Sequence, residues 1–247
     1  MASGPMVDVN AETIVQRLVP DDVLGRVFGA LDSAAIVADC ARRVVEAGFG
    51  GVMIVASNPV DAMAQVAQRA SGLPVGQVIG TGTLLDSARF RRRLADRLGV
   101  APVSVEGQVL GEHGDSEVAV FSGVRIGGVT LDQFRGGAVL DRAELAHETM
   151  RAGYAINYGK GHTSYGVATA IVRLCEAVRR DEQVVLPVST LAHGECGVAG
   201  VYLSLPCVIG ALGVSRVLAP DLDAEERAAL RASAAVLQGI MDGLESH

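Results

Sequence analysis

Residues 55–100 read VASNPVDAMAQVAQRASGLPVGQVIGTGTLLDSARFRRRLADRLGV, and this stretch decides the fold. It opens on the end of a short apolar run, Val52–Ala56, which lacks polar alternation and is typical of a strand buried on both faces. Residues 60–70 have the spacing of a helix, and Val78–Gly80 form a second short apolar run. Asp86 can cap a further helix, in which large apolar residues recur every four positions. This order of strands and helices predicts a parallel α/β sheet up to about residue 100.

The sequence on either side extends this pattern and then changes it. Upstream, residues 34–47 predict an amphipathic helix that Gly48 ends, whereas residues 1–30 show the least regular pattern. One side of that helix carries Ile36, Val37, Cys40, Val44 and Val45. Downstream, we expect strands at Val103–Leu110, Glu117–Phe121, Val124–Ile126, Val184–Ser189 and Gly200–Leu205, and helices at Leu140–Tyr158, Ser164–Arg179 and Ala224–Leu244. Mixed strands and long helices of this kind indicate an α+β second part.

The composition excludes several classes of protein. The chain has 247 residues, 49% of them hydrophobic, which suits one compact unit or two closely joined lobes. A formal net charge of −7 argues against a general nucleic-acid-binding protein. The four cysteines form no CxxC pair, so we expect no structural zinc and no disulfide framework, but reduced thiols in the cytoplasm. We see no secretory signal at the N-terminus and no apolar run of membrane-spanning length.

The loops that leave the two predicted parallel strands are polar. Asn58 lies just beyond the first strand, and Thr81 lies just beyond the second. Ligands of open parallel sheets bind outside the carboxyl ends of the strands, so we expect Asn58, Thr81 and Asp86 to face one crevice. Arg89 lies three residues after Asp86, on the same side of a helix start, and its planar guanidinium suits a carboxylate ligand.

A second informative stretch is GEHGDSE, residues 111–117. A histidine between two glycines can be exposed at a strand end and closely approached by a small molecule. Taken alone, the stretch is equally well explained as a turn, because turns favour Gly, Asp and Ser for backbone reasons. A hydrolase site made of Ser116, His113 and Asp115 is a further interpretation. The chain has no GxSxG elbow, however, and residues this close in sequence rarely form a triad.

Three motifs in this order, SNPVD (57–61), GTGTLLDSARFR (80–91) and GEHGDSE (111–117), resemble the L-lactate dehydrogenase family. The likeness continues through KGHTSYG (160–166), VSTLAHGECGV (188–198) and LSLPCVIGALGV (203–214). It implies a truncated Rossmann-type parallel sheet in a partial dinucleotide-binding domain over residues 1–101. An α+β lactate/malate dehydrogenase C-terminal domain over residues 102–247 would follow. The resemblance also implies NAD as cofactor, a small 2-keto or 2-hydroxy acid as substrate, no metal ion, and a homo-oligomer, either a tetramer or a dimer.

The resemblance assigns roles to individual residues. His113 resembles the general acid that protonates the 2-keto oxygen and acts as base in the reverse direction, and Asp86 resembles its carboxylate partner. Arg89 resembles the clamp on the substrate carboxylate. Thr163 matches a position on the wall of the substrate pocket that is Thr in lactate dehydrogenases and usually smaller in malate dehydrogenases. Contacts to the nicotinamide side are implied for Ala56, Ser57, Asn58 and Thr81, and Asn58 also contacts the substrate oxygen.

Other positions match the family less closely. Counting back from Asn58 without gaps places Arg26 at the family's mobile-loop arginine, which polarises the substrate carbonyl; the alternative is a surface arginine. The position that reads the substrate tail, Gln in lactate and Arg in malate enzymes, is Pro20 here, which selects neither. Arg91 matches an arginine that binds the activator fructose 1,6-bisphosphate in many bacterial members. Glu106 replaces the accompanying histidine and would repel phosphate, so we do not expect activation by this effector.

The chain departs from the family pattern at its N-terminus. The GxGxxG loop that holds the cofactor pyrophosphate is missing, and with it the first βαβ unit; Asp8 resembles a relic of the acid that holds the adenosine ribose. This loss would expose apolar faces of Val52–Ala56 and of the helix at 34–47. Two hypotheses follow. The chain is an NAD-dependent L-lactate dehydrogenase or a close relative such as a malate-type enzyme, or it is an inactive truncated relative that does not bind NAD.

Overall fold

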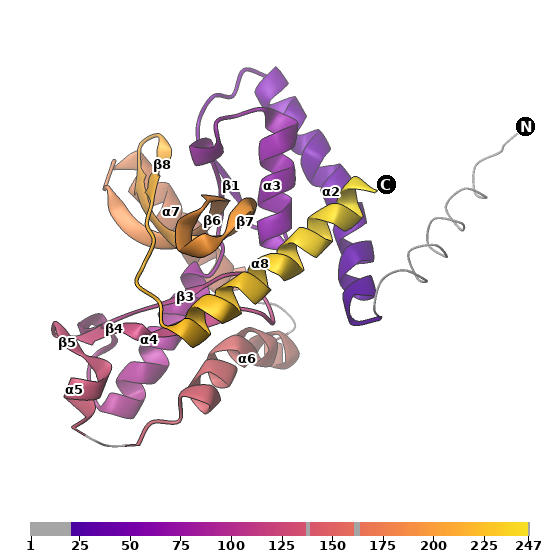
Figure 1. Cartoon of the computed structure of the whole chain (residues 1–247). Coiled ribbons are helices and arrows are strands. Elements are labelled where there is room, and N and C mark those ends of the chain that lie inside the picture. The colour runs from indigo at the N-terminus through magenta and orange to yellow at the C-terminus, as the bar shows by residue number, and fades with distance from the viewer. Residues whose placement is uncertain (1–20, 137–138, 161–163, 247) are drawn as a thin grey trace, which may run out of the picture.

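The computed structural model describes residues 21–136, 139–160 and 164–246. Its main sheet has five strands in the order β1-β2-β6-β7-β8 (Figure 1). These strands are β1 (Met53–Val55), β2 (Val78–Gly80), β6 (Val184–His193), β7 (Ala199–Gly210) and β8 (Gly213–Val217). β1 and β2 are parallel, with Val55 opposite Gly80, whereas the other pairs are antiparallel. Because Gly80 also pairs with Ser189 of β6, the two predicted groups of strands form one mixed sheet.

A smaller antiparallel sheet contains β3 (Val105–Leu110), β4 (Val118–Ile126) and β5 (Val129–Thr130). Gly111, directly after β3, joins this sheet to the main one through a bridge to Ser204 of β7. The Gly111 N–H donates to the Ser204 carbonyl at 3.0 Å, and the Ser204 N–H donates back at 2.9 Å. The end of β3 is therefore fixed against the middle of the main sheet.

Helices surround the two sheets. They are α2 (Asp21–Glu46), α3 (Val60–Ser71), α4 (Leu84–Leu98), α5 (Leu131–Arg135), α6 (Arg142–Lys160), α7 (Ser164–Arg179) and α8 (Ala224–Glu245). α3 packs on β6 and β7, and α8 runs from β4 across β7 and α3 to α2 (Figure 1). α4 packs along β3, which brings the first turn of this helix to the loop that follows the strand.

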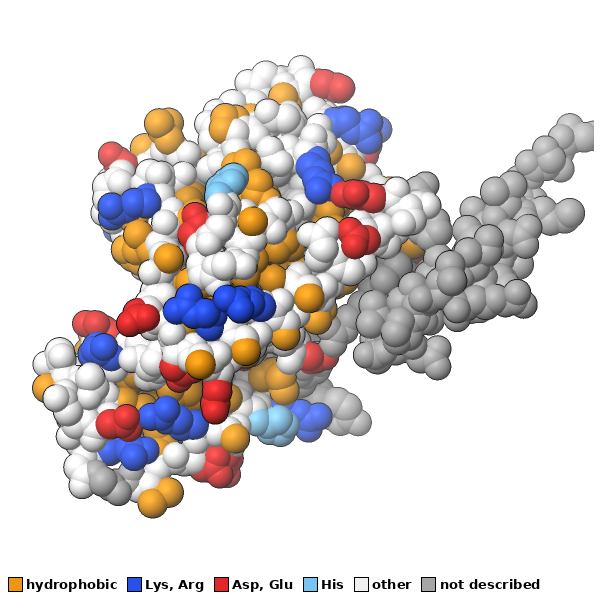
Figure 2. Space-filling view, in the orientation of Figure 1, with side chains coloured by type: hydrophobic (Ala, Val, Ile, Leu, Met, Phe, Trp, Pro, Cys, Tyr) orange, Lys and Arg blue, Asp and Glu red, His pale blue; other side chains and the backbone are white. Residues whose placement is uncertain are grey.

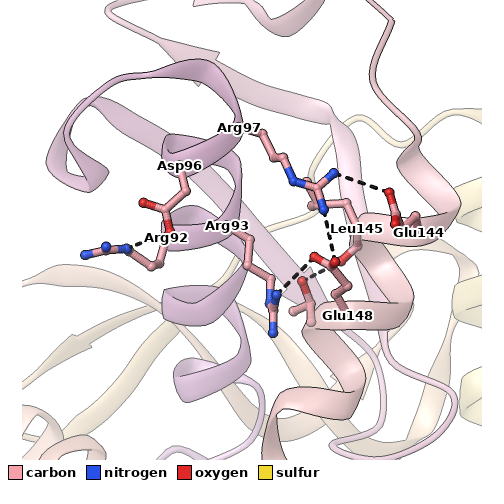
Figure 3. A network of polar contacts seen from close by, with 8 residues as sticks. Arg92, Arg93, Asp96, Arg97, Glu144, Leu145 and Glu148 are labelled. Carbon is pink, nitrogen blue, oxygen red and sulfur yellow. Dashed lines mark hydrogen bonds and ion pairs between the residues drawn. The ribbon is translucent and has the colours of Figure 1, made fainter.

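The apolar spacing of α4 builds the smaller core. Phe90 and Leu94 are fully buried, as their four-residue spacing predicts, and Phe90 meets Phe121 of β4 edge to face with ring centroids 5.1 Å apart. Neighbouring positions of α4, beside this apolar side, form ion pairs with α6 (Figure 3). Arg93 and Arg97 each place a guanidinium nitrogen 3.0 Å from a carboxylate oxygen of Glu148. Apolar packing and ion pairs on one side of α4 thus hold the helix in place.

The helix α2 starts earlier than the sequence pattern predicts. Residues 21–30, part of the stretch with the least regular sequence pattern, belong to the helix, which therefore begins before the expected residue 34. Apolar residues recur at helical spacing there, but Gly25 and Gly29 lower the helix propensity and obscure the pattern. Within the expected amphipathic stretch, Ala41 is buried, whereas Ile36 is 65% exposed.

Other boundaries also differ from the sequence analysis. Asp86 does not cap α4: the helix begins at Leu84, Thr83 occupies the N-cap position, and Asp86 lies in the first turn. The two strands expected between residues 117 and 126 form the single strand β4, whose pairing with β3 is irregular between Val120 and Arg125. β6 and β7 continue beyond their expected ends because they pair over almost their whole length. The sequence analysis missed β8 and α5, both of which are five residues long.

Candidate active site

The carboxyl ends of β1 and β2 form one side of the candidate site. The Thr81 N–H donates to the Val55 carbonyl at 2.9 Å, so the two loops leave the sheet side by side. Ser57 and Asn58 are exposed beyond β1, and Ala56 and Thr81 are half-buried. The structure therefore brings the four residues expected on the nicotinamide side to one edge of the sheet.

Buried hydroxyl groups fasten the start of α4 to the end of β3. The Val109 N–H donates to the Ser87 hydroxyl at 2.8 Å, and the Thr83 hydroxyl donates to the Val109 carbonyl at 2.5 Å. Ser204 of β7 accepts from the Thr83 N–H at 2.9 Å. These contacts fix the first turn of α4, and with it Asp86, beside the loop that carries His113.

Asp86, His113 and Arg89 form one connected group. The Nδ1 atom of His113 lies 2.6 Å from Oδ2 of Asp86, and Nη1 of Arg89 donates to Oδ1 of Asp86 at 2.7 Å. The Asp86 side chain is 2% exposed, whereas that of His113 is 30% exposed and that of Arg89 is 15% exposed. The carboxylate is thus enclosed, and the imidazole and guanidinium keep access to solvent. Because Asp86 engages Nδ1, the imidazole's other nitrogen, Nε2, is left for a ligand.

The environment favours a charged pair. Burial lowers the pKa of His113, but the hydrogen bond and the charge of Asp86 outweigh it and raise this pKa to about 9. Burial likewise opposes ionisation of Asp86, yet His113 and Arg89 hold the pKa of that carboxyl below its ordinary value. At neutral pH His113 therefore carries a proton that it can donate.

Three consecutive backbone amides anchor the loop of His113 to three different elements. Gly111 donates to Ser204 of β7, Glu112 donates to the Ser233 hydroxyl of α8 at 2.8 Å, and His113 donates to Oδ2 of Asp61 at 2.8 Å. Asp61 belongs to α3 and is 1% exposed, and burial raises its pKa to about 6. The sequence analysis did not single out Asp61 or Ser233. Asp61 stands in the quoted SNPVD motif, whereas no local pattern marks Ser233, which lies in a helix more than a hundred residues away.

Glu117 is a further residue of the site that the sequence analysis did not select. A carboxylate oxygen of Glu117, an oxygen of Asp86 and a ring nitrogen of His113 lie within 4.8 Å of one another. Its signal in the sequence was its place as the last residue of GEHGDSE, where it was taken as the start of a strand.

The remaining candidates have different surroundings. The Ser116 hydroxyl donates to Glu112 and lies 3.1 Å from the Ser233 hydroxyl, so its hydrogen bonds are not to His113 and the hydrolase interpretation loses its support. Nη1 of Arg91 donates to the Gly107 carbonyl at 3.1 Å, next to the exposed Glu106. The side chain of Arg26 lies outside the described residues, and so do Thr163, Pro20 and Asp8.

Models of two known domain families match the chain. A model of the lactate/malate dehydrogenase α/β C-terminal domain matches residues 83–246, and one of the lactate/malate dehydrogenase NAD-binding domain matches residues 31–80. The chain belongs to the lactate/malate dehydrogenase family. This lactate/malate dehydrogenase family member is 46% identical over 217 residues to an L-lactate dehydrogenase of Thermus aquaticus. It is 41% identical over 208 residues to the L-lactate dehydrogenase of Treponema denticola. These matches cover 86% and 82% of the chain, but 70% and 66% of the respective relatives.

Solved structures of the family agree with this membership. The minor L-lactate dehydrogenase of Enterococcus mundtii, in its ligand-unbound form, matches with a TM-score of 0.84 and 35% identity over 89% of this chain and 72% of that one. The L-lactate dehydrogenase of Clostridium thermocellum matches with a TM-score of 0.83 and 35% identity over 90% of this chain and 74% of that one. The truncated Rossmann-type sheet followed by an α+β part, expected from the sequence, is confirmed.

Proposed function

We propose that the chain is an oxidoreductase of the L-lactate dehydrogenase type, which interconverts a small 2-keto acid, pyruvate, and the corresponding L-2-hydroxy acid. The Asp86–His113 pair carries this proposal, because it holds a protonated imidazole whose side chain stays partly accessible to solvent. His113 donates its proton to the keto oxygen during reduction and accepts a proton from the hydroxyl group during oxidation. Asp86 fixes the tautomer and stabilises the imidazolium.

Arg89 and Asn58 complete the substrate side. The Arg89 guanidinium uses Nη1 for Asp86, and its remaining N–H groups supply donors for the substrate carboxylate. Asn58 stands exposed at the end of β1, where its amide can donate to the substrate oxygen. We also assign Arg26 to the polarisation of the substrate carbonyl and Thr163 to the pocket wall, on the family pattern alone.

The residues of this chain fit one end of NAD. Ala56, Ser57, Asn58 and Thr81 offer accessible backbone and polar groups at the edge of β1 and β2, which suits the nicotinamide side. The sequence contains no GxGxxG loop for the pyrophosphate. When bound, NAD would supply the hydride acceptor or donor. The residues of the chain position the keto acid and move the proton.

Two assays test this proposal, one of cofactor and substrate-analogue binding and one of pyruvate reduction. Titration of the chain with NADH, followed by nicotinamide fluorescence with and without the pyruvate analogue oxamate, measures cofactor and substrate-site binding together. An active enzyme is expected to bind NADH, to bind oxamate, and to reduce pyruvate in preference to oxaloacetate.

His113→Asn is expected to abolish reduction while leaving NADH affinity within about twofold, since it removes the proton donor alone. Absence of NADH binding at millimolar cofactor favours the inactive truncated relative, and a preference for oxaloacetate favours a malate-type enzyme.

The proposal that the chain is a dehydrogenase of this type extends to its partners and its location in the cell. The exposed apolar face of α2, with Ile36 and Val44, supports a homo-oligomer, either a tetramer or a dimer. All four cysteines are free, which fits the reducing cytoplasm. On the face shown in Figure 2, Arg side chains are interspersed with Asp and Glu, which does not favour nucleic acid as a ligand. None of the helices in the described ranges combines the length and the apolar character that a membrane crossing demands.

A further inference from the structure

Glu117 lies directly beside the Asp86–His113 pair, but the proposed reaction does not yet use it. The residue immediately precedes β4, and its carboxylate is within 4.8 Å of both an Asp86 oxygen and a His113 ring nitrogen. Both oxygens of Asp86 are occupied, one by His113 and the other by Arg89. Glu117 is therefore a second carboxyl group next to the imidazole, on a separate segment from the first.

Glu117 holds a proton under conditions in which Asp86 does not. Burial and the negative charge of Asp86 raise the pKa of Glu117 to about 8, so that its carboxyl group is protonated at neutral pH. The other charged groups that face it are Arg89 on α4, and His113 and Asp115 on its own loop. The charge of Asp61 on α3 also raises the pKa of His113. The imidazole therefore has one neighbour that stabilises its charge and another that carries a transferable proton.

We propose that Glu117 is a positioning residue for proton transfer, which holds a proton beside His113 and returns it to the imidazole after His113 has protonated the substrate. This step rests on the proposed function. The O–H bond of Glu117 breaks and an N–H bond forms on the neutral imidazole, which leaves a carboxylate and an imidazolium. A separation of up to 4.8 Å is spanned by one water molecule, which relays the proton. The Glu117 side chain is half-buried, so it regains its proton from solvent.

The charge distribution favours this transfer. A neutral imidazole leaves Asp86 with Arg89 as its remaining cationic partner, whereas transfer from Glu117 restores the His113–Asp86 ion pair. The new Glu117 carboxylate further stabilises the imidazolium. During oxidation of the hydroxy acid the same step runs in reverse at a pH where Glu117 is ionised, and its carboxylate takes up the proton that His113 has received.

NMR of the His113 ring nitrogens, followed as a function of pH without substrate or cofactor, tests whether the ionisation of Glu117 affects that of His113. In the full chain we expect two steps, since ionisation of Glu117 perturbs the imidazole before the imidazole itself loses its proton. Glu117→Gln should give one step, with its midpoint lower by about one pH unit, and Glu117→Asp should restore two steps. Glu106→Gln removes an exposed carboxylate from β3 and is the matched control, expected to titrate as the unaltered chain does. A single step at the same midpoint in the unaltered chain and in Glu117→Gln overturns the proposal.

Steady-state kinetics separates this role from a structural one. In pyruvate reduction, Glu117→Gln should lower kcat about tenfold while KM changes less than about twofold, because proton return follows substrate binding. An increase in KM with unchanged kcat overturns the proposal and makes Glu117 a binding residue. Oxamate binding by the unaltered chain is measured in parallel. Failure to bind oxamate contradicts the proposed function, whereas the NMR titration decides the coupling of Glu117 to His113 independently.

Discussion

The imidazole of His113 and the carboxylate of Asp86 lie 2.6 Å apart, between Nδ1 and Oδ2, although the two residues are 27 positions apart in the chain. The start of α4 and the end of β3 bring them together through Thr83 and Ser87, whose side chains bond to the backbone of Val109. The pair is therefore a product of helix-to-strand packing.

Replacement of Asp86 should change the proton affinity of His113. In Asp86→Asn, burial still lowers the pKa of His113, but the carboxylate that raises it to about 9 is gone, so the pKa should fall to its ordinary range or below. NMR titration of the imidazole measures this shift. The other histidines of the chain are internal controls, and an unchanged His113 midpoint would show that Asp86 is not its dominant partner.

The same pair predicts how the stability of the protein depends on pH. The pKa of His113 is raised in the folded protein from 6.5 to about 9, so its contribution is complete below pH 6.5 and is lost as the pH rises toward 9. Over that interval the unaltered chain should lose on the order of 2 kcal/mol more stability than Asp86→Asn does. Urea unfolding at pH 6.5 and pH 9 checks this difference. Parallel pH dependence in the two proteins contradicts the prediction.

Asp61 should matter for the backbone of the His113 loop. Asp61→Ala leaves the partly buried His113 N–H without its acceptor, and we expect a loss of about 1–2 kcal/mol in the free energy of unfolding. Asp61→Asn keeps an oxygen for that N–H, so it should recover part of the loss. Urea unfolding of both variants at pH 7 gives the comparison. Equal losses for Ala and Asn would mean that the hydrogen bond to His113 contributes little.

Gly111 should tolerate no side chain, for two separable reasons. Its φ of +87° lies in the left-handed region, and an added Cβ would approach the Ser233 hydroxyl to 2.6 Å. Gly99 has a φ of +69° but open space around it, so Gly99→Ala measures the backbone cost alone, about 1 kcal/mol. Gly111→Ala should cost about 1–3 kcal/mol more, since the Ser233 side chain, which accepts from the Glu112 N–H, must shift. Similar thermal unfolding temperatures for the two variants would contradict this prediction.

The ion pairs between α4 and α6 should contribute little to stability and should depend on salt. Glu148→Gln breaks the contacts with Arg93 and Arg97, whose side chains are about one third exposed, so we expect a loss below about 1 kcal/mol (Figure 3). Thermal unfolding at low and high salt should show this loss shrinking as salt screens the charges. Asp96→Asn, which removes the exposed partner of Arg92 within α4, is the matched control. A loss that is larger in high salt would exclude an electrostatic origin.

Periodicity and motif order predicted much of the fold. α3, β2 and α8 lie where apolar spacing and turn residues placed them, because each of these signals is local. The pairing of Gly80 with Ser189, which merges two groups of strands into one sheet, has no local signal and depends on tertiary contacts. The early start of α2 was missed because Gly25 and Gly29 interrupt an otherwise helical pattern.

The candidate site was predictable to a similar degree. The i, i+3 spacing of Asp86 and Arg89 predicted that they share one side of α4, but not that they form an ion pair, and the resemblance linked Asp86 to His113. The roles of these residues in catalysis stay predictions. Ser233 could not be found from the sequence, because its hydroxyl acts on a backbone amide 121 residues away and an isolated serine in a helix carries no signal. Glu117 was overlooked because a strand residue with a carboxylate usually faces solvent.

The anchoring of the Gly111, Glu112 and His113 amides to β7, α8 and α3 has a consequence for motion. Exchange of any one of these protons with solvent requires the loop to separate from its partner element, and the three partners belong to different parts of the chain. Fluctuation of one helix cannot release all three, so simultaneous exchange of the three amides requires the loop to separate from β7, α8 and α3. The backbone that carries the imidazole is thus anchored to three elements before any ligand arrives, and large movements of this loop require the opening of more than one of them.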